Sequence, residues 1–145
     1  MLLTGTHPRT LDEKKRFALP RRIREELGDV AKLFVTQGLD RCLWLYRPAE
    51  MQQLAAKLDE HPATNEEVRT FRRLFFAKME AVDVDRAGRV LMPERLMQVA
   101  NLKHDVVLIG VQDHLELWDL GRWQEFEAAN AARFDAVAEG AFRNR

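Results

Sequence analysis

Two short segments of the chain combine residue types that can pair with each other or with nucleic acid. They are DEKKRFALP at 12–20 and DRAGRVLMP at 85–93, and in each an Asp stands four residues before an Arg and eight before a Pro. A carboxylate in a turn accepts backbone N–H groups and pairs with a nearby guanidinium. A guanidinium also forms paired hydrogen bonds with phosphate or with a guanine edge. The motif therefore predicts either a structural brace or a nucleic-acid contact, and taken alone it leaves both open.

The two segments differ in the charge that surrounds them. Residues 9–24 contain seven basic and two acidic residues, a net charge of +5, whereas residues 82–97 contain three of each. The whole chain carries 23 Lys and Arg against 23 Asp and Glu, so the surplus is local. Phosphate binding requires such a surplus, although a solvated basic surface explains it equally well. The basic residues of the first segment are Arg9, Lys14, Lys15, Arg16, Arg21, Arg22 and Arg24.

The duplication extends beyond these segments. LFVTQGLDRCLWLY at 33–46 aligns with DVVLIGVQDHLELW at 105–118, with Gly38 opposite Gly110. The shift along the chain is one residue smaller for this pair than for the first pair, and a loop absorbs such a slip at little cost. Two short copies are too few for a solenoid, so we expect two repeats that complete one core together.

Each repeat predicts the order strand, turn, strand, short helix, strand, strand. The returning segments RFALP and RVLMP are short and end at Pro, which is typical of strands. Pro20 and Pro93 suit the first position of the following helix, where a missing N–H costs nothing. Gly28 is expected as the C-cap of the first of these helices, and Gly88 as a left-handed turn residue.

Three longer helices are expected outside these strands, at 48–59, 64–80 and 119–139. In the second, Thr64 and Glu67 are expected to form a capping box, because each side chain can satisfy the other's backbone N–H. The second helix has an apolar face that predicts packing on the core or on a neighbouring subunit. The apolar residues are Val68, Phe71, Phe75 and Met79 in the second helix, and Trp123, Phe126, Phe134 and Val137 in the third.

The composition argues against several classes of function. The chain has no Ser and no Gly-rich phosphate loop, and its four His residues lack metal-ligand spacing. We therefore expect no enzyme, cofactor, metal or small-molecule substrate. The single Cys, Cys42, excludes an internal disulfide and is expected to be a small core residue in a reducing compartment. No apolar stretch reaches the length of a membrane span, so we expect a soluble cytoplasmic protein that has no membrane partner.

The two units resemble the halves of MraZ, a family of bacterial transcriptional regulators with tandem SpoVT/AbrB-type domains. LDEKKRFALP and VDRAGRVLMP, each followed by a short helix and a strand pair, carry the resemblance, which covers about residues 1–134. It implies an α+β fold with a mainly β core, a swapped-hairpin AbrB/MraZ-like β-barrel built from two internal repeats, with added helices. The implied parts are a first repeat at 5–51, connecting helices at 52–80, a second repeat at 81–124, and a C-terminal helix and tail at 125–145.

The resemblance also assigns site residues. The family's Asp-x-x-x-Arg falls on Asp12 with Arg16 and on Asp85 with Arg89, and Val82 and Met97 replace the further arginines of the first repeat. The Gly expected before the first Arg is a Lys, which tolerates positive φ less well, so a different turn geometry is expected there. The resemblance implies DNA contacts by Arg9, Lys14, Arg16, Arg24 and Arg89, and the charge of the two segments adds Lys15, Arg21 and Arg86 to the predicted DNA-binding residues. Those with a structural role in the motif are Asp12, Asp85 and Gly88.

The function implied by the resemblance is sequence-specific binding to double-stranded promoter DNA. It includes recognition of short repeated boxes upstream of the division and cell-wall gene cluster, by a ring-shaped homo-oligomer associated with the nucleoid. A second hypothesis is a non-enzymatic assembly or interaction protein whose basic patch contacts a protein partner. A nucleotide-processing enzyme has the least support, since the chain lacks recognisable catalytic machinery.

Overall fold

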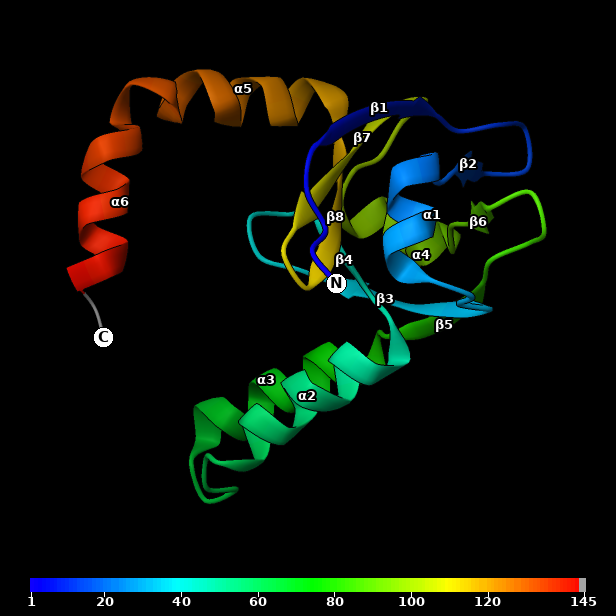
Figure 1. The fold of residues 1–145 in the computed structure, drawn as a ribbon. Coiled ribbons are helices and arrows are strands. Elements are labelled where there is room, and N and C mark those ends of the chain that lie inside the picture. The colour runs from blue at the N-terminus through cyan, green and yellow to red at the C-terminus, as the bar shows by residue number, and fades with distance from the viewer. Residues whose placement is uncertain (144–145) are drawn as a thin grey trace.

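The structure is a computed structural model that describes residues 1–143, and it contains the two predicted repeats in the predicted order. Each repeat has two strands, a short helix and two more strands, and longer helices follow each repeat (Figure 1). The first repeat consists of β1 (Thr6–Thr10), β2 (Arg16–Ala18), α1 (Arg21–Leu27), β3 (Lys32–Gln37) and β4 (Leu43–Tyr46). The second consists of β5 (Glu80–Asp83), β6 (Arg89–Leu91), α4 (Glu94–Val99), β7 (Asp105–Val111) and β8 (His114–Asp119). The remaining elements are α2 (Pro48–Asp59), α3 (Glu66–Ala77), α5 (Leu120–Asn130), the 3-10 helix η1 (Ala131–Arg133) and α6 (Phe134–Arg143).

The strands of the two repeats are interleaved. One antiparallel six-stranded sheet has the order β1-β7-β8-β4-β3-β5, and β2 pairs with β6 in a separate two-stranded ribbon. The first strand of each repeat therefore lies against the third strand of the other. This arrangement confirms the predicted α+β fold in which two repeats share a mainly antiparallel β core.

A pseudo-twofold axis relates the repeats and passes through both sheets. In the ribbon, Phe17 pairs with Val90, its counterpart in the alignment of the two Asp segments. In the large sheet, Trp44 pairs with Glu116, its counterpart in the alignment of the two strand pairs. Equivalent residues of the sequence repeat thus face each other in both sheets, so each repeat occupies an equivalent place in the fold. Neither repeat can close its core without the other.

Both faces of the large sheet are covered. Leu43 and Leu45 on β4 point into the main core with ribbon residues Phe17 and Val90, while Tyr46 points to the other face, which α2 and α3 cover. Successive side chains of a strand point to opposite faces, and a sheet covered on both sides needs nearly continuous apolar strands. This accounts for sequences such as LWLY and VVLI.

Cys42 and Phe75 lie where the sequence predicted apolar packing. Cys42 is buried beside Val107 and Trp118, and burial is the main reason that the pKa of its thiol lies well above its ordinary value. Phe75 is buried against Tyr46 and neighbouring residues, which confirms the expected phase of α3. Phe71, on the same helix, is 39% exposed.

Three predicted helix ends are wrong. Pro20 and Pro93 precede α1 and α4 as N-caps instead of occupying the first helical position, because both have extended ψ angles (146° and 132°). The cap of α3 is Asn65, not Thr64, and its side-chain oxygen accepts the N–H of Val68 at 3.2 Å. Asn is a stronger N-cap than Thr, so it starts the helix one residue later.

The predicted C-terminal helix is interrupted. The Asn130 side chain donates to the carbonyl oxygen of Phe126 at 2.8 Å, and the chain passes through η1 before α6 begins. Asn side chains compete in this way with the backbone hydrogen bonds of a helix. Within residues 1–143, no helix is long and apolar enough to cross a lipid bilayer.

Candidate nucleic-acid interface

The first candidate site is the turn between β1 and β2. The Asp12 carboxylate accepts the backbone N–H groups of Lys14 and Arg16, both at 2.9 Å, through Oδ1. Its Oδ2 accepts the Nε–H of Arg16 at 2.8 Å. The backbone N–H of Arg16 is the main cause, and its side chain a further one, of an Asp12 pKa below the ordinary range, with desolvation opposing both. The carboxylate therefore stays ionised, closes the turn and fixes the direction of the Arg16 side chain.

The second turn, between β5 and β6, repeats this geometry. Asp85 accepts the backbone N–H and the Nε–H of Arg89, each at 2.8 Å. Lys15 and Gly88 occupy equivalent positions with φ angles of 63° and 78°. Their N–H groups donate to the carbonyl oxygens of Asp12 and Asp85 at 3.0 and 2.9 Å. The expectation that Lys15 would change the turn is wrong, because Lys15 adopts the left-handed conformation itself.

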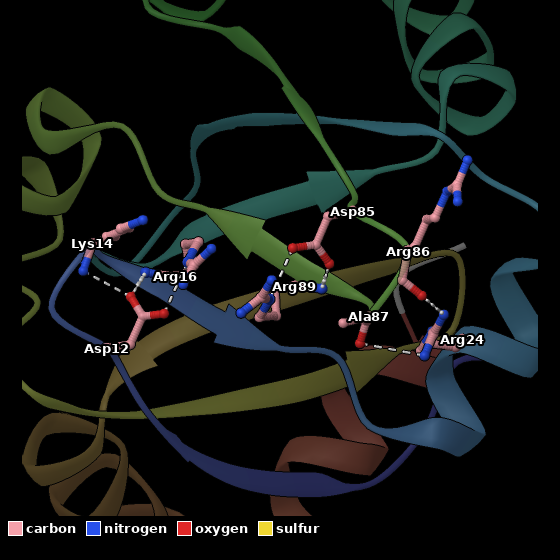
Figure 2. A network of polar contacts seen from close by, with 8 residues as sticks. All are labelled: Asp12, Lys14, Arg16, Arg24, Asp85, Arg86, Ala87 and Arg89. Atoms are coloured by element: carbon pink, nitrogen blue, oxygen red, sulfur yellow. Dashed lines mark hydrogen bonds and ion pairs between the residues drawn. The ribbon is translucent and has the colours of Figure 1, made fainter.

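The ribbon β2–β6 brings the two arginines onto one exposed surface. Phe17 and Val90 point into the core, so Arg16 and Arg89 lie on the opposite face of the ribbon. Arg16 pairs with Leu91, and Ala18 with Arg89, which makes the two arginines diagonal neighbours (Figure 2). Each uses its Nε–H on its own Asp. Within residues 1–143, the terminal Nη groups of Arg16 and Arg89 donate to no protein acceptor.

Leu91 belongs to this surface and was not predicted as a site residue. It is 53% exposed on the outer face of the ribbon, directly opposite Arg16. An exposed leucine beside arginines is suited to apolar contact with a thymine methyl group. The alternation of outward and inward residues in RVLMP contains the signal, since Arg89 and Leu91 share one face of a strand.

Two predicted DNA contacts, Arg24 and Arg9, are engaged within the protein. Arg24 on α1 donates to the carbonyl oxygens of Ala87 and Arg86, at 3.4 and 3.1 Å, and so lies against the turn of the other repeat (Figure 2). Arg9 donates through Nε to the carbonyl oxygen of Ala18 at 2.9 Å. The charge of residues 9–24 is therefore divided between the two turns, and a DNA role for these two arginines remains a prediction.

The other predicted contacts lie at the exposed edges of the site. Lys14, Lys15 and Arg86 are exposed residues of the two turns. Arg21 is an exposed residue of α1 that pairs with Glu25 at 3.3 Å. None of them is buried, so all remain accessible to a partner, and their role in DNA binding remains a prediction.

The second repeat adds a cation to the first turn. Lys103 and His104 border a hollow that Lys15 and Met97 also line, and the His104 carbonyl oxygen accepts the N–H of Leu11 at 2.9 Å. Charge counted along the chain misses Lys103, because the residue reaches the first turn only through the interleaved fold.

At the second turn, the equivalent of this backbone bond runs from Val84 to the carbonyl oxygen of Ala31 at 2.9 Å. Val30 stands at the position equivalent to Lys103, but Lys32 follows Ala31 directly where Asp105 follows His104, so each site has one lysine nearby in sequence. The two turns are thus alike in backbone, and the first carries Glu13, Lys14 and Lys15 where the second carries Arg86, Ala87 and Gly88.

Comparison with known sequences decides the family. The family model described as "MraZ protein, putative antitoxin-like" matches the chain twice, over residues 2–74 and 75–145. The chain belongs to the MraZ family. Among its relatives, proteins named transcriptional regulator MraZ from Clostridium tetani and Acetivibrio thermocellus are 37% and 38% identical over 138 and 135 residues. The alignments cover 95% of both chains in the first case and 93% in the second. The relative of the same name from Limosilactobacillus fermentum is 38% identical and covers 96% of each chain.

Membership of the MraZ family confirms the predicted resemblance and the two-repeat organisation. It also agrees with the prediction that the chain is not an enzyme, since the family is one of transcriptional regulators. Within residues 1–143, no group of three or more His, Cys, Asp or Glu side chains is arranged to hold a metal ion.

Gly88→Ala should destabilise the protein by roughly 1–2 kcal/mol, because an L-residue is disfavoured at positive φ. The added Cβ would also lie 2.6 Å from Arg24 Cδ and force that side chain to move. Lys15→Gly is the matched control, since it relieves the same conformation in the first turn and should not lower stability. Urea unfolding measures both. Equal losses for the two variants would contradict the prediction.

Proposed function

We propose that the chain is a sequence-specific DNA-binding transcriptional regulator that presents the ribbon β2–β6 to the major groove. The observation that carries this proposal is the pair Arg16 and Arg89, each oriented by an Asp and placed side by side on an exposed two-stranded ribbon. The major groove admits a two-stranded ribbon, and an Arg fork pairs with the edge of guanine. The name shared by the relatives, transcriptional regulator MraZ, supports the same function.

The brace and the reader are compatible roles for the same arginine. The carboxylate of Asp12 takes the Nε–H of Arg16 and limits the rotation of the side chain. Preorganisation of this kind reduces the entropy lost when the guanidinium binds a partner. A guanidinium held in this way is better suited to a specific contact with a base than a mobile guanidinium, which would bind phosphate groups without regard to sequence.

The proposal includes the partners and the place of action. Short repeated boxes upstream of the division and cell-wall gene cluster are the proposed target, and a ring-shaped homo-oligomer is the proposed binding form. One box contacts only a small surface of the protein and is bound weakly. Several linked binding surfaces raise the effective concentration of each surface near the DNA, and with it the overall affinity. A regulator of this kind acts in the cytoplasm, associated with the nucleoid.

A salt-dependent binding titration tests the proposal. The full-length protein is titrated onto duplex DNA from its own division-cluster promoter and onto a scrambled duplex, at several salt concentrations. We expect tighter binding to the promoter and a steep loss of affinity with salt, because phosphate contacts release counterions. Equal binding to both duplexes, or none, would instead favour the alternative, an assembly protein whose basic patch contacts protein.

Lys103→Gln should weaken binding to promoter and scrambled duplexes alike. A phosphate contact carries no sequence information, and its loss lowers the salt slope by about one for each bound chain. Lys57→Gln on α2 is the matched control, as it removes an exposed lysine from the α2–α3 hairpin instead of from the first turn. A selective loss on the promoter duplex, or an unchanged salt slope, would show that Lys103 does not contact phosphate.

A further inference from the structure

The last helix carries large apolar side chains that stay exposed within residues 1–143. Phe134, Val137 and Phe142 on α6 are 74%, 49% and 75% exposed. Residues three or eight apart lie on the same side of a helix, so Phe134 shares one broad face with Val137 and with Phe142. Figure 1 shows α6 at the end of α5, clear of the sheet. Single exposed apolar residues are ordinary, but an apolar face of this size marks an interaction surface.

The position of α6 is set by its connection. The rings of Trp118, Trp123 and Phe126 contact one another, with Trp123 stacked on Phe126 and edge-on to Trp118, and they attach α5 to the sheet. Asn130 then bonds the carbonyl oxygen of Phe126, and Arg133 donates to the Asn130 side chain at 3.0 Å. These contacts turn the chain at η1, so α6 is held away from its own core in a defined direction.

A second apolar surface lies on α3 and the β3–β4 turn. A hollow of about 190 Å³ opens there, lined mainly by Leu39, Trp44, Phe71 and Leu74. Leu39 and Leu74 are 62% and 56% exposed. The hollow is large enough to receive an aromatic side chain, and it stays open within the described part of the chain, residues 1–143.

The charges beside the two surfaces are complementary when the helices run antiparallel. Along α6, Asp135 and Glu139 precede Arg143 at intervals of one turn, whereas α3 has Glu67 in its first turn and Arg73 further along. An antiparallel arrangement places Arg143 near Glu67, and Asp135 near Arg73, over similar lengths of helix. A parallel arrangement would place like charges together at both ends. Complementary charges of this kind fix register and suppress wrong pairings.

We propose that α6 of one chain docks in the hollow on α3 of a second copy, with the two helices antiparallel. The helix and the hollow are different surfaces of one molecule, so the contact is heterologous and can repeat until a ring closes. This inference rests on the homo-oligomer of the proposed function, and it names the elements that join the subunits. It also gives a role to the apolar residues that the core does not use.

Two charge-introducing variants test the contact in the full-length chain. Phe142→Asp alters the docking helix, and Leu74→Asp alters the hollow. We expect wild type to show the mass of several chains by light scattering, and each variant to show the mass of one chain. Leu2→Asp, at a residue 60% exposed outside both surfaces, is the control and should assemble as wild type does.

Mixing the variants identifies the partner surface. In a mixture of Phe142→Asp and Leu74→Asp chains, one intact helix and one intact hollow remain, so we expect a species of two chains and no larger one. Its formation also shows that both variants are folded. If Leu74→Asp loses α3, which circular dichroism would reveal, Leu39→Asp tests the same hollow from the β3–β4 turn.

Several results would overturn the inference. It fails if either variant keeps the wild-type mass, or if the folded variants remain single chains when mixed. Normal assembly of Leu74→Asp with loss of assembly in Phe142→Asp would show that α6 pairs with another surface, such as a second α6. A monomeric wild type would contradict the proposed ring as well as the contact between α6 and α3. Titration of a single-box duplex tests DNA binding separately, because that contact needs no second subunit.

Discussion

Arg16→Ala should weaken binding to promoter DNA roughly tenfold to a hundredfold and leave the melting temperature nearly unchanged. A paired contact to a guanine edge contributes about 1–3 kcal/mol of discrimination, and each 1.4 kcal/mol is about a tenfold change in Kd. The truncation removes only one of three hydrogen bonds to the Asp12 carboxylate, since the other two come from backbone N–H groups. The turn should therefore survive the loss of the side chain.

Asp12→Ala separates the two roles of the motif. It removes all three hydrogen bonds, so it should lower stability more than Arg16→Ala does, while it leaves the guanidinium present but no longer held. If Arg16 only braces the turn, Arg16→Ala should reduce binding no more than Asp12→Ala. If it contacts DNA, Arg16→Ala should reduce binding more and stability less. Titrations and melting curves of both variants decide between these roles.

Arg89→Ala provides the comparison between repeats. Residues 9–24 carry a net charge of +5 and residues 82–97 carry none, although Arg24 of the first repeat is bonded to the backbone of the second turn. We therefore expect Arg16→Ala to reduce affinity more than Arg89→Ala. Equal losses would show that the ribbon binds DNA symmetrically about its pseudo-twofold axis, and that the surrounding charge does not decide which repeat contributes more.

The sequence predicts the elements of the fold well because its repeat is real in three dimensions. Residues at equivalent positions of the two copies meet in the sheets, as Phe17 does with Val90 and Trp44 with Glu116. Local chemistry also predicts the Asp motif, since a carboxylate four residues before an arginine closes the same turn in both copies. The interleaved strand order came from the family resemblance, because periodicity within one repeat does not reveal which strand of the other repeat it contacts.

The surroundings of the site could not be read from the chain order. Arg24 is close to Arg16 in sequence but lies against the opposite turn, while Lys103 is distant in sequence and lines the same hollow as Lys15. Strand interleaving exchanges these neighbours, so a linear charge count assigns Arg24 to the wrong turn. The break at Asn130 escaped prediction for a different reason, as it depends on one side chain that competes with the helix backbone.

Phe75→Ala should lower the free energy of unfolding by roughly 3–5 kcal/mol, the range found when a buried Phe is truncated. Phe75 is 3% exposed, contacts Trp44, Phe71 and Phe76 through its ring, and is the buried residue of α3 that packs on Tyr46 of the sheet. Its carbonyl oxygen accepts the hydroxyl of Thr36 at 3.0 Å, so the backbone at this position is also tied to the sheet. The melting temperature should fall by roughly 10 °C or more.

Phe71→Ala is the matched control for this prediction, because it removes the same side chain from the same helix at a position 39% exposed. It should cost clearly less, since less contact area is lost and water can refill the site. Phe75 also lines the hollow proposed to receive α6, so Phe75→Ala should reduce assembly as well as stability. An unchanged melting temperature with unchanged oligomer mass would show that α3 does not rest on the sheet through Phe75, and that the hollow is formed without it.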